Sequence, residues 1–150
     1  MDLSKFSRDD WIIVGLAFLL AVDVLFLPWF DYTFGFGPFT RSITLSATDT
    51  PDGWLGVLGL LAALALIADL ALERAGASQL PSLAGSRAGT RLALAGAAAF
   101  FLALKFILHA HFSLFGFGFW AAVVLCIALV ATGFRALDLE ARSANAPTGA

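Results

Sequence analysis

Four apolar runs, each about as long as a bilayer's hydrocarbon core is thick, set the strongest limit on how this chain folds. They cover residues 11–30, 54–72, 92–112 and 114–134. A helix of roughly 20 residues crosses about 30 Å of hydrocarbon, since each residue rises about 1.5 Å. Lipid offers no partner for free backbone N–H and C=O groups, so helices are the favoured spanning structure. The sequence therefore predicts an all-α membrane protein, a four-transmembrane-helix bundle.

The composition agrees with a bilayer as the main solvent. Hydrophobic residues make up 60% of the chain and charged residues only 13%, whereas about a quarter of a soluble domain is charged. The net charge of −2 gives no electrostatic reason to expect a nucleic-acid partner. The single cysteine, Cys126, lies in an apolar run and cannot form an internal disulfide.

Basic residues gather on one side of the predicted bilayer. Only Arg41 lies in the predicted outer loop, residues 31–52, whereas seven basic residues flank the opposite ends of the runs. The positive-inside rule and the even number of spans then predict that both termini lie in the cytoplasm. We expect the chain to lie in the plasma (inner) membrane. The seven are Lys5, Arg8, Arg74, Arg87, Arg91, Arg135 and Arg142.

The chain reads as a single transmembrane domain over residues 1–142. Residues 73–91 form the predicted inner loop, and residues 143–150 form a tail whose composition predicts disorder. Asp69, near the inner end of the second run, is interpreted as a solvated interfacial carboxylate.

Local patterns predict where three helices begin. Ser7 and Asp10 have the spacing of a capping box ahead of the first run. Thr50 before Pro51 places a capping hydroxyl before a proline suited to a first helical turn. Ser86 can cap the third helix.

The predicted outer loop carries strand signals. Residues 42–48 alternate polar and apolar side chains, the period of a half-buried strand. Phe34 and Phe36 would share one face of a preceding strand, and residues 37–38, Gly-Pro, can turn the chain. We predict a short β-hairpin that lies on the outer mouth of the bundle.

Ionisable residues occur at two positions within the hydrocarbon depth, where a charge costs about 2.5–3.5 kcal/mol. Asp23 and Lys105 both lie about 18–20 Å from the cytoplasmic boundary by helical rise. Their matched depth predicts an ion pair that sets how the first and third helices face each other. Alternatively, they serve a proton or ion relay, or Lys105 extends to the outer interface without meeting Asp23.

Two further polar residues extend this pattern towards the outside. His109 shares a helix face with Lys105, and Asp31 shares roughly the face of Asp23. The resulting stripe suits a half-channel that opens outward, or a pocket for a polar headgroup.

Aromatic residues are concentrated at the outer ends of the runs, more than an interfacial belt requires. We interpret them as a surface that binds a partner protein or lipid. The candidate binding residues are Trp29, Phe34, Phe36, Phe39, Trp54, Phe115, Phe117 and Trp120.

Short aromatic motifs at the ends of the runs carry a resemblance. FLPWF at residues 26–30 ends the first run, DGW at 52–54 opens the second, and GFGFW at 116–120 opens the fourth. Together they resemble a group of uncharacterised four-span membrane proteins of actinobacterial type. The resemblance implies the four-span architecture and no activity or functional residues.

The sequence is compatible with three functions. The first is a non-enzymatic accessory protein that docks another membrane protein, a second copy of itself or a lipid. The second is a small transporter or channel that uses the polar stripe. The third is a lipid-acting enzyme with His109 or His111 as base, oriented by Asp31 or Asp49. No nucleophile–base set, metal-ligand spacing or phosphate loop stands out, so we predict no catalytic residue, metal or cofactor.

Overall fold

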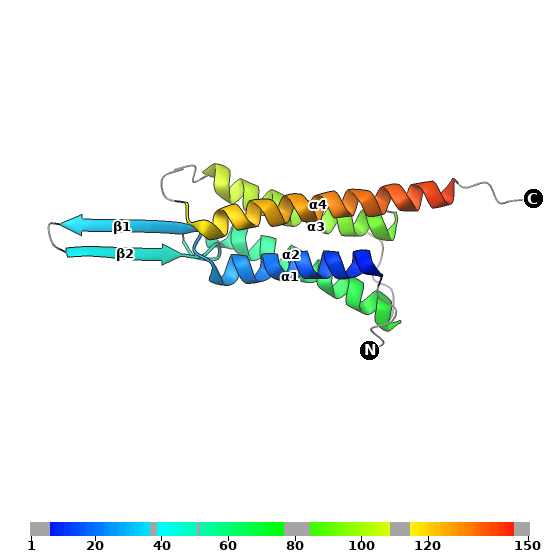
Figure 1. Ribbon diagram of the computed structural model, residues 1–150, viewed down its shortest axis with the longest axis horizontal. Helices are drawn as coiled ribbons and strands as arrows, with labels where there is room; N and C mark the ends of the chain where they lie inside the picture. The colour runs from blue at the N-terminus through cyan, green and yellow to red at the C-terminus, as the bar shows by residue number, and fades with distance from the viewer. Residues whose placement is uncertain (1–6, 37–38, 51, 77–84, 109–114, 146–150) are drawn as a thin grey trace, which may run out of the picture.

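The computed structural model describes residues 7–36, 39–50, 52–76, 85–108 and 115–145. Four helices lie side by side, and two strands form a hairpin at one end (Figure 1). The elements are α1 (Arg8–Phe26), β1 (Phe30–Phe36), β2 (Phe39–Leu45), α2 (Gly53–Ala75), α3 (Arg87–Leu108) and α4 (Phe117–Ala144).

The helices close into a ring of neighbours. α1 packs mainly on α2 and α4, and α3 packs mainly on the same two helices, so α1 and α3 lie on a diagonal. We call the end from which the strands project the hairpin end. The opposite end, where Arg74, Arg87 and Arg91 lie, is the arginine end.

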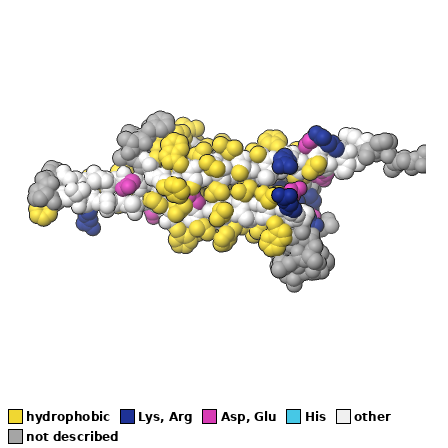
Figure 2. Space-filling view, in the orientation of Figure 1, with side chains coloured by type: hydrophobic (Ala, Val, Ile, Leu, Met, Phe, Trp, Pro, Cys, Tyr) yellow, Lys and Arg dark blue, Asp and Glu magenta, His cyan; other side chains and the backbone are white. Residues whose placement is uncertain are grey.

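Helices α2, α3 and α4 are each long and apolar enough to cross a bilayer, which indicates a membrane protein. Helix α1 has 19 residues and carries Asp9, Asp10 and Asp23 within that length, so three of the four predicted spans are shown. On the face that Figure 2 shows, hydrophobic side chains cover the middle of the helices, and most of the visible Lys and Arg side chains gather at the arginine end.

The first helix ends earlier than its apolar run. Pro28 disfavours helical backbone at the residue before it, and Leu27 accordingly adopts an extended conformation. The following Trp29 N–H donates to the Leu45 carbonyl, 2.8 Å away. The apolar residues up to Phe30 therefore leave the helix and enter the base of the hairpin.

The same segment sets the start of α4. The Gly118 N–H donates to the Pro28 carbonyl at 2.9 Å, and Phe30 forms a β-bridge with Phe115. α4 then continues to Ala144, into the predicted disordered tail. The tail beyond residue 145 lies outside the described residues.

Two of the three predicted helix starts are confirmed. Ser7 and Asp10 form a reciprocal capping box, and Ser86 accepts a hydrogen bond from the first turn of α3. The prediction for Thr50 is wrong. The residue that caps α2 is Asp52, which has left-handed backbone and makes no side-chain capping bond. The chain before α2 packs on the first turn of that helix, since a Cβ atom at Gly53 would lie 2.2 Å from the Thr48 carbonyl oxygen.

The hairpin is confirmed, but its predicted position on the mouth of the bundle is wrong. β1 and β2 pair antiparallel from Phe30 opposite Leu45 to Phe36 opposite Phe39. They extend along the long axis of the bundle and away from it (Figure 1).

Among the described residues, the contacts between the hairpin and the helices lie at the base of the hairpin. The Gly116 N–H donates to the Trp29 carbonyl, Phe30 bridges to Phe115, and Lys105 lies near the Phe30 ring. Most of the strands remain exposed.

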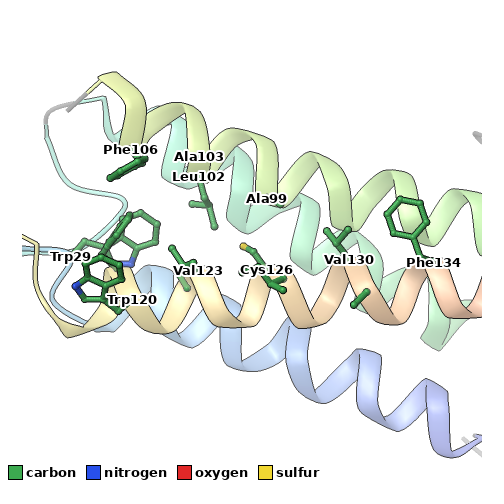
Figure 3. Close-up of a pocket in the computed structure, with 14 residues that line it drawn as sticks. Trp29, Ala99, Leu102, Ala103, Phe106, Trp120, Val123, Cys126, Val130 and Phe134 are labelled. Atoms are coloured by element: carbon green, nitrogen blue, oxygen red, sulfur yellow. The ribbon is translucent and has the colours of Figure 1, made fainter. Parts of the chain in front are cut away.

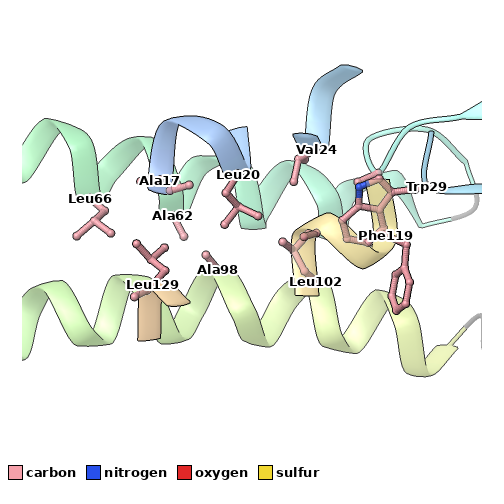
Figure 4. Close-up of a cluster of buried hydrophobic side chains, with 14 of the residues drawn as sticks. Ala17, Leu20, Val24, Trp29, Ala62, Leu66, Ala98, Leu102, Phe119 and Leu129 are labelled. Atoms are coloured by element: carbon pink, nitrogen blue, oxygen red, sulfur yellow. The ribbon is translucent and has the colours of Figure 1, made fainter. Parts of the chain in front are cut away.

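Small residues let the helices approach closely around the core (Figure 4). Ala17, Ala62 and Ala98 are buried beside larger side chains such as Leu66 and Leu129. Each helix contributes to this cluster, which the indole of Trp29 extends towards the hairpin end (Figure 4).

Gly56 allows the loop before α2 to lie directly on the helix. A Cβ atom at this position would lie 2.1 Å from the Ala47 carbonyl oxygen. That distance is far inside van der Waals contact, so the backbone of the loop would have to move.

We expect Gly56→Ala to destabilise the fold by about 1–3 kcal/mol, because overpacking forces the backbone to shift. Gly96→Ala is the matched control, since nothing lies within 4 Å of the added Cβ. The control should be neutral or stabilising by up to about 1 kcal/mol, because glycine costs that much within a helix. Thermal unfolding in mild detergent, followed by circular dichroism, measures both. Equal midpoints for the two variants would contradict this account of the loop.

Candidate functional site

The buried carboxyl of Asp23 is held by a tryptophan rather than by a cation. Asp23 is 1% exposed, and its Oδ2 accepts a hydrogen bond from the Trp29 indole at 3.1 Å. Its Oδ1 has no partner within the described part of the chain. Asp23 therefore fixes the indole at the hairpin end of the core.

The buried ammonium of Lys105 holds the loop between β2 and α2. Lys105 is fully buried, and its Nζ donates to the carbonyls of Ala47 at 2.5 Å and Asp49 at 2.9 Å. The ring of Phe30 lies 5.7 Å from the same nitrogen, within cation–π range. One cation thus joins α3 to the loop and to the base of the hairpin.

The carboxyl of Asp49 organises the same loop from outside the bundle. It accepts hydrogen bonds from the backbone N–H and the hydroxyl of Ser46, at 2.7 and 2.9 Å. These bonds, with a smaller contribution from the Lys105 charge, hold the pKa of Asp49 below its usual range. Within the described residues, Asp49 makes turn contacts with Ser46, and the predicted orientation of a histidine base by Asp49 stays a prediction.

The predicted ion pair between Asp23 and Lys105 is not what the structure contains. Within the described residues, the two side chains bond to different groups, an indole and two loop carbonyls. Asp31 is exposed on the hairpin and joins neither. His109 and His111 lie outside the described residues. The described members of the polar stripe are therefore not brought together, and the relay and the lipid-acting site stay predictions.

The arginine end contains an ion network that the sequence analysis missed. Arg91 interacts with three carboxylates, at 3.4 Å from Asp10 and 3.7 Å from Asp69, with Glu73 as the third. Arg87 lies 3.1 Å from Asp69, and Arg74 pairs with Asp10. The network joins α1, α2 and α3, and consists of Asp10, Asp69, Glu73, Arg74, Arg87 and Arg91.

Asp69 is therefore not the solvated carboxylate that we expected, since it is 1% exposed and neutralised by arginines from α3. A sequence signal for the network existed. Asp69 with Glu73, and Arg87 with Arg91, are each spaced four residues apart, so each pair presents two like charges on one helix face. Complementary faces on adjacent helices favour contact. The network has as many basic as acidic members, and it joins three helices at the arginine end.

The hairpin has one aromatic and one polar face. Directly paired residues share a face, so Phe30, Tyr32 and Phe34 lie opposite Leu45, Ile43 and Arg41. The Tyr32 ring stacks against the rings of Phe30 and Phe34, with centroids 6.3 and 6.4 Å away. The other face carries Asp31, Thr33, Thr40, Ser42 and Thr44.

Exposure along the aromatic face rises towards the tip. Phe30 is buried at the base, Tyr32 is half-buried, and Phe34 and Ile43 are exposed. Phe39, beside the tip, is 81% exposed. A two-stranded sheet with one uncovered apolar face is marginal by itself, so this face is a candidate binding surface.

The other predicted binding residues divide into two groups. Trp54, Phe117 and Trp120 are exposed near the first turns of α2 and α4. Trp29 is buried in the core, and Phe115 is half-buried in the aromatic cluster with Phe119. The side chain of Phe36 lies outside the described set.

An apolar groove runs between α3 and α4 on the surface of the bundle (Figure 3). Its volume is about 670 Å³, within the range of small-molecule sites. Leu102, Phe119 and Ala122 form a buried floor, and Ala103 and Trp120 are exposed at its rim.

No protein-family model, curated protein or solved structure matches this chain. The resemblance to actinobacterial four-span proteins therefore stays a prediction. Over the described residues, no three His, Cys, Asp or Glu side chains converge in a metal-binding arrangement.

We expect Asp69→Asn to destabilise the protein by at least about 2 kcal/mol, because it leaves two arginines short of a buried counter-charge. Asp138→Asn is the matched control. Its partner Arg142 lies 2.8 Å away, and both side chains are exposed, so the loss should be below about 1 kcal/mol. Unfolding in mild detergent measures both variants. A cost for Asp69→Asn no greater than that of the control would show that the network contributes no stability.

Proposed function

We propose that this chain is a non-enzymatic membrane accessory protein that docks a partner membrane protein through the aromatic face of its hairpin. One observation carries the proposal. The aromatic face begins buried at Phe30 and continues past the bundle, and no described part of the chain covers it near Phe34 and Phe39.

The reach of the hairpin favours protein over lipid as the occupant. Each strand has seven residues, so the hairpin extends about 23 Å from its base at about 3.3 Å per residue. The headgroup layer on each side of a bilayer is about 5–8 Å thick. With the base at the hydrocarbon boundary, the tip stands in water. Exposed aromatic side chains in water are typical of a protein-binding surface.

The placement of the base follows from the helices. We propose that α1 also crosses the bilayer, because its 19 residues extend about 28 Å, close to the hydrocarbon thickness. Its neutralised Asp10 lies at one boundary and the buried Asp23 lies within the bundle. The arginine end then faces the cytoplasm by the positive-inside rule, and the hairpin faces outward.

The side chains on the hairpin also indicate what the partner surface contains. The aromatic face carries one exposed cation, Arg41, opposite Phe34. A complementary surface would therefore be apolar with an acidic residue near the Arg41 position. We propose an extracytoplasmic segment of another membrane protein with this chemistry.

A photocrosslinking amino acid at Ile43 tests the proposal in membranes of the source organism, with Ser42 on the polar face as the matched position. Both positions are exposed, so water should quench the photoactivated probe to a similar extent at each. We expect crosslinks from position 43 to one membrane protein, several-fold above those from position 42. Phe34→Ser should reduce them at least tenfold, because it removes an aromatic contact of the same face.

Three results would contradict docking of a partner protein. Crosslinks only between copies of this chain would make the face a self-association surface. Crosslinks only to phospholipid would place the hairpin on the membrane. Equal crosslinking from positions 42 and 43 would show that the aromatic face has no specific occupant.

A further inference from the structure

The groove between α3 and α4 results from how the two helices meet at their ends. At the arginine end, Gly133 lets α4 approach Leu92 so closely that an added Cβ would lie 3.3 Å from its Cα. At the hairpin end, Phe119 is stacked between other rings, with Phe106 at 4.9 Å and Phe115 at 4.3 Å between centroids. These rings hold the helices apart, and the space between the two contacts is the groove (Figure 3).

From the groove we infer that this protein binds a single hydrocarbon chain, the acyl chain of a membrane phospholipid, along α4. The inference does not depend on the docking proposal, because no residue of β1 or β2 lines the groove.

The dimensions fit one chain. The α4 side of the groove extends from Trp120 to Phe134, about 21 Å at 1.5 Å per residue. A volume of about 670 Å³ over that length gives a mean cross-section of about 32 Å². Since carbon atoms of adjacent chains approach to about 4 Å, one methylene chain needs about 16 Å². Two chains would need about 32 Å², the whole mean cross-section, so the irregular walls of the groove favour one chain.

A partner helix does not fit the same space. A helix with its side chains is about 10 Å across, so its cross-section is about 80 Å². The groove could hold less than half of that. Only a thin, flexible apolar chain can reach the buried floor formed by Leu102 and Ala122.

The chemistry of the walls selects hydrocarbon. The polar side-chain groups along the lining are the Cys126 thiol and the indole N–H groups of Trp29 and Trp120. The Trp29 N–H already donates to Asp23. A buried polar group of a ligand would therefore lack partners over most of the groove, and this loss disfavours polar ligands.

The bilayer around α3 and α4 contains the acyl chains that would occupy the groove. Both α3 and α4 are apolar enough to cross a bilayer, so the rim of the groove faces lipid. One leaflet of hydrocarbon is about 15 Å thick, so a groove of about 21 Å accepts a whole extended acyl chain. The headgroup would remain at the hairpin end beside Trp120, a residue type that favours the membrane interface.

The test uses phosphatidylcholine with a diazirine near the end of one acyl chain, in phosphatidylcholine vesicles containing the full chain. After photolysis, peptide mass spectrometry locates the label. We expect it on the groove side of α4, around Val130 and Phe134. Ala103→Trp should reduce that labelling at least fivefold, because the indole would fill the groove.

Ala65→Trp on α2 is the matched control, since Ala65 is also an exposed alanine in a helix that can span the bilayer and does not line the groove. It should leave labelling unchanged. If Ala103→Trp fails to fold, Ala131→Trp serves in its place, because Ala131 is exposed and lines the groove. Labelling spread evenly over exposed positions of all helices, or insensitive to the groove variants, would overturn the inference.

Discussion

The buried ammonium group of Lys105 is the interaction on which the hairpin end of the molecule depends. It binds the Ala47 and Asp49 carbonyls, and the Ala47 carbonyl itself lies against Gly56 of α2. A charge in a low-dielectric interior is costly unless hydrogen-bonded. Hydrogen bonds from the loop carbonyls offset this cost only while the loop is packed on the helices. The lysine and the loop therefore stabilise each other. The direction in which the hairpin leaves the bundle follows from that loop.

The two ends of the bundle accommodate buried charge in different ways. At the arginine end, carboxylates and guanidinium groups neutralise each other across three helices. At the hairpin end, Lys105 and Asp23 are matched instead with dipoles, two carbonyls and an indole. Directional bonds to dipolar partners fix geometry, which suits an end that must hold a projecting hairpin in one orientation.

Both proposed binding surfaces arise because apolar groups remain uncovered after the bundle is complete. In our proposals, the hairpin face stands beyond the bilayer and binds a protein, whereas the groove lies within the bilayer and binds hydrocarbon. The aromatic cluster around Phe119 and Phe115 connects them. It holds α3 and α4 apart on one side and meets the base of β1 through the Phe30–Phe115 bridge on the other. The same rings therefore lie next to both proposed surfaces.

The sequence by itself determined the helices, the hairpin and the caps at Ser7 and Ser86, because apolar periodicity and capping chemistry act over a few residues. Only the tertiary structure decided the partners of Asp23 and Lys105. Asp23 and Lys105 lie at matched depth along their helices, but depth does not predict which helices are neighbours. In the bundle, α1 and α3 lie on a diagonal. The partners came from Trp29 and the loop at residues 46–49, whose positions depend on close approaches at glycines. Such contacts join residues far apart in the chain, and no local pattern encodes the distance between them.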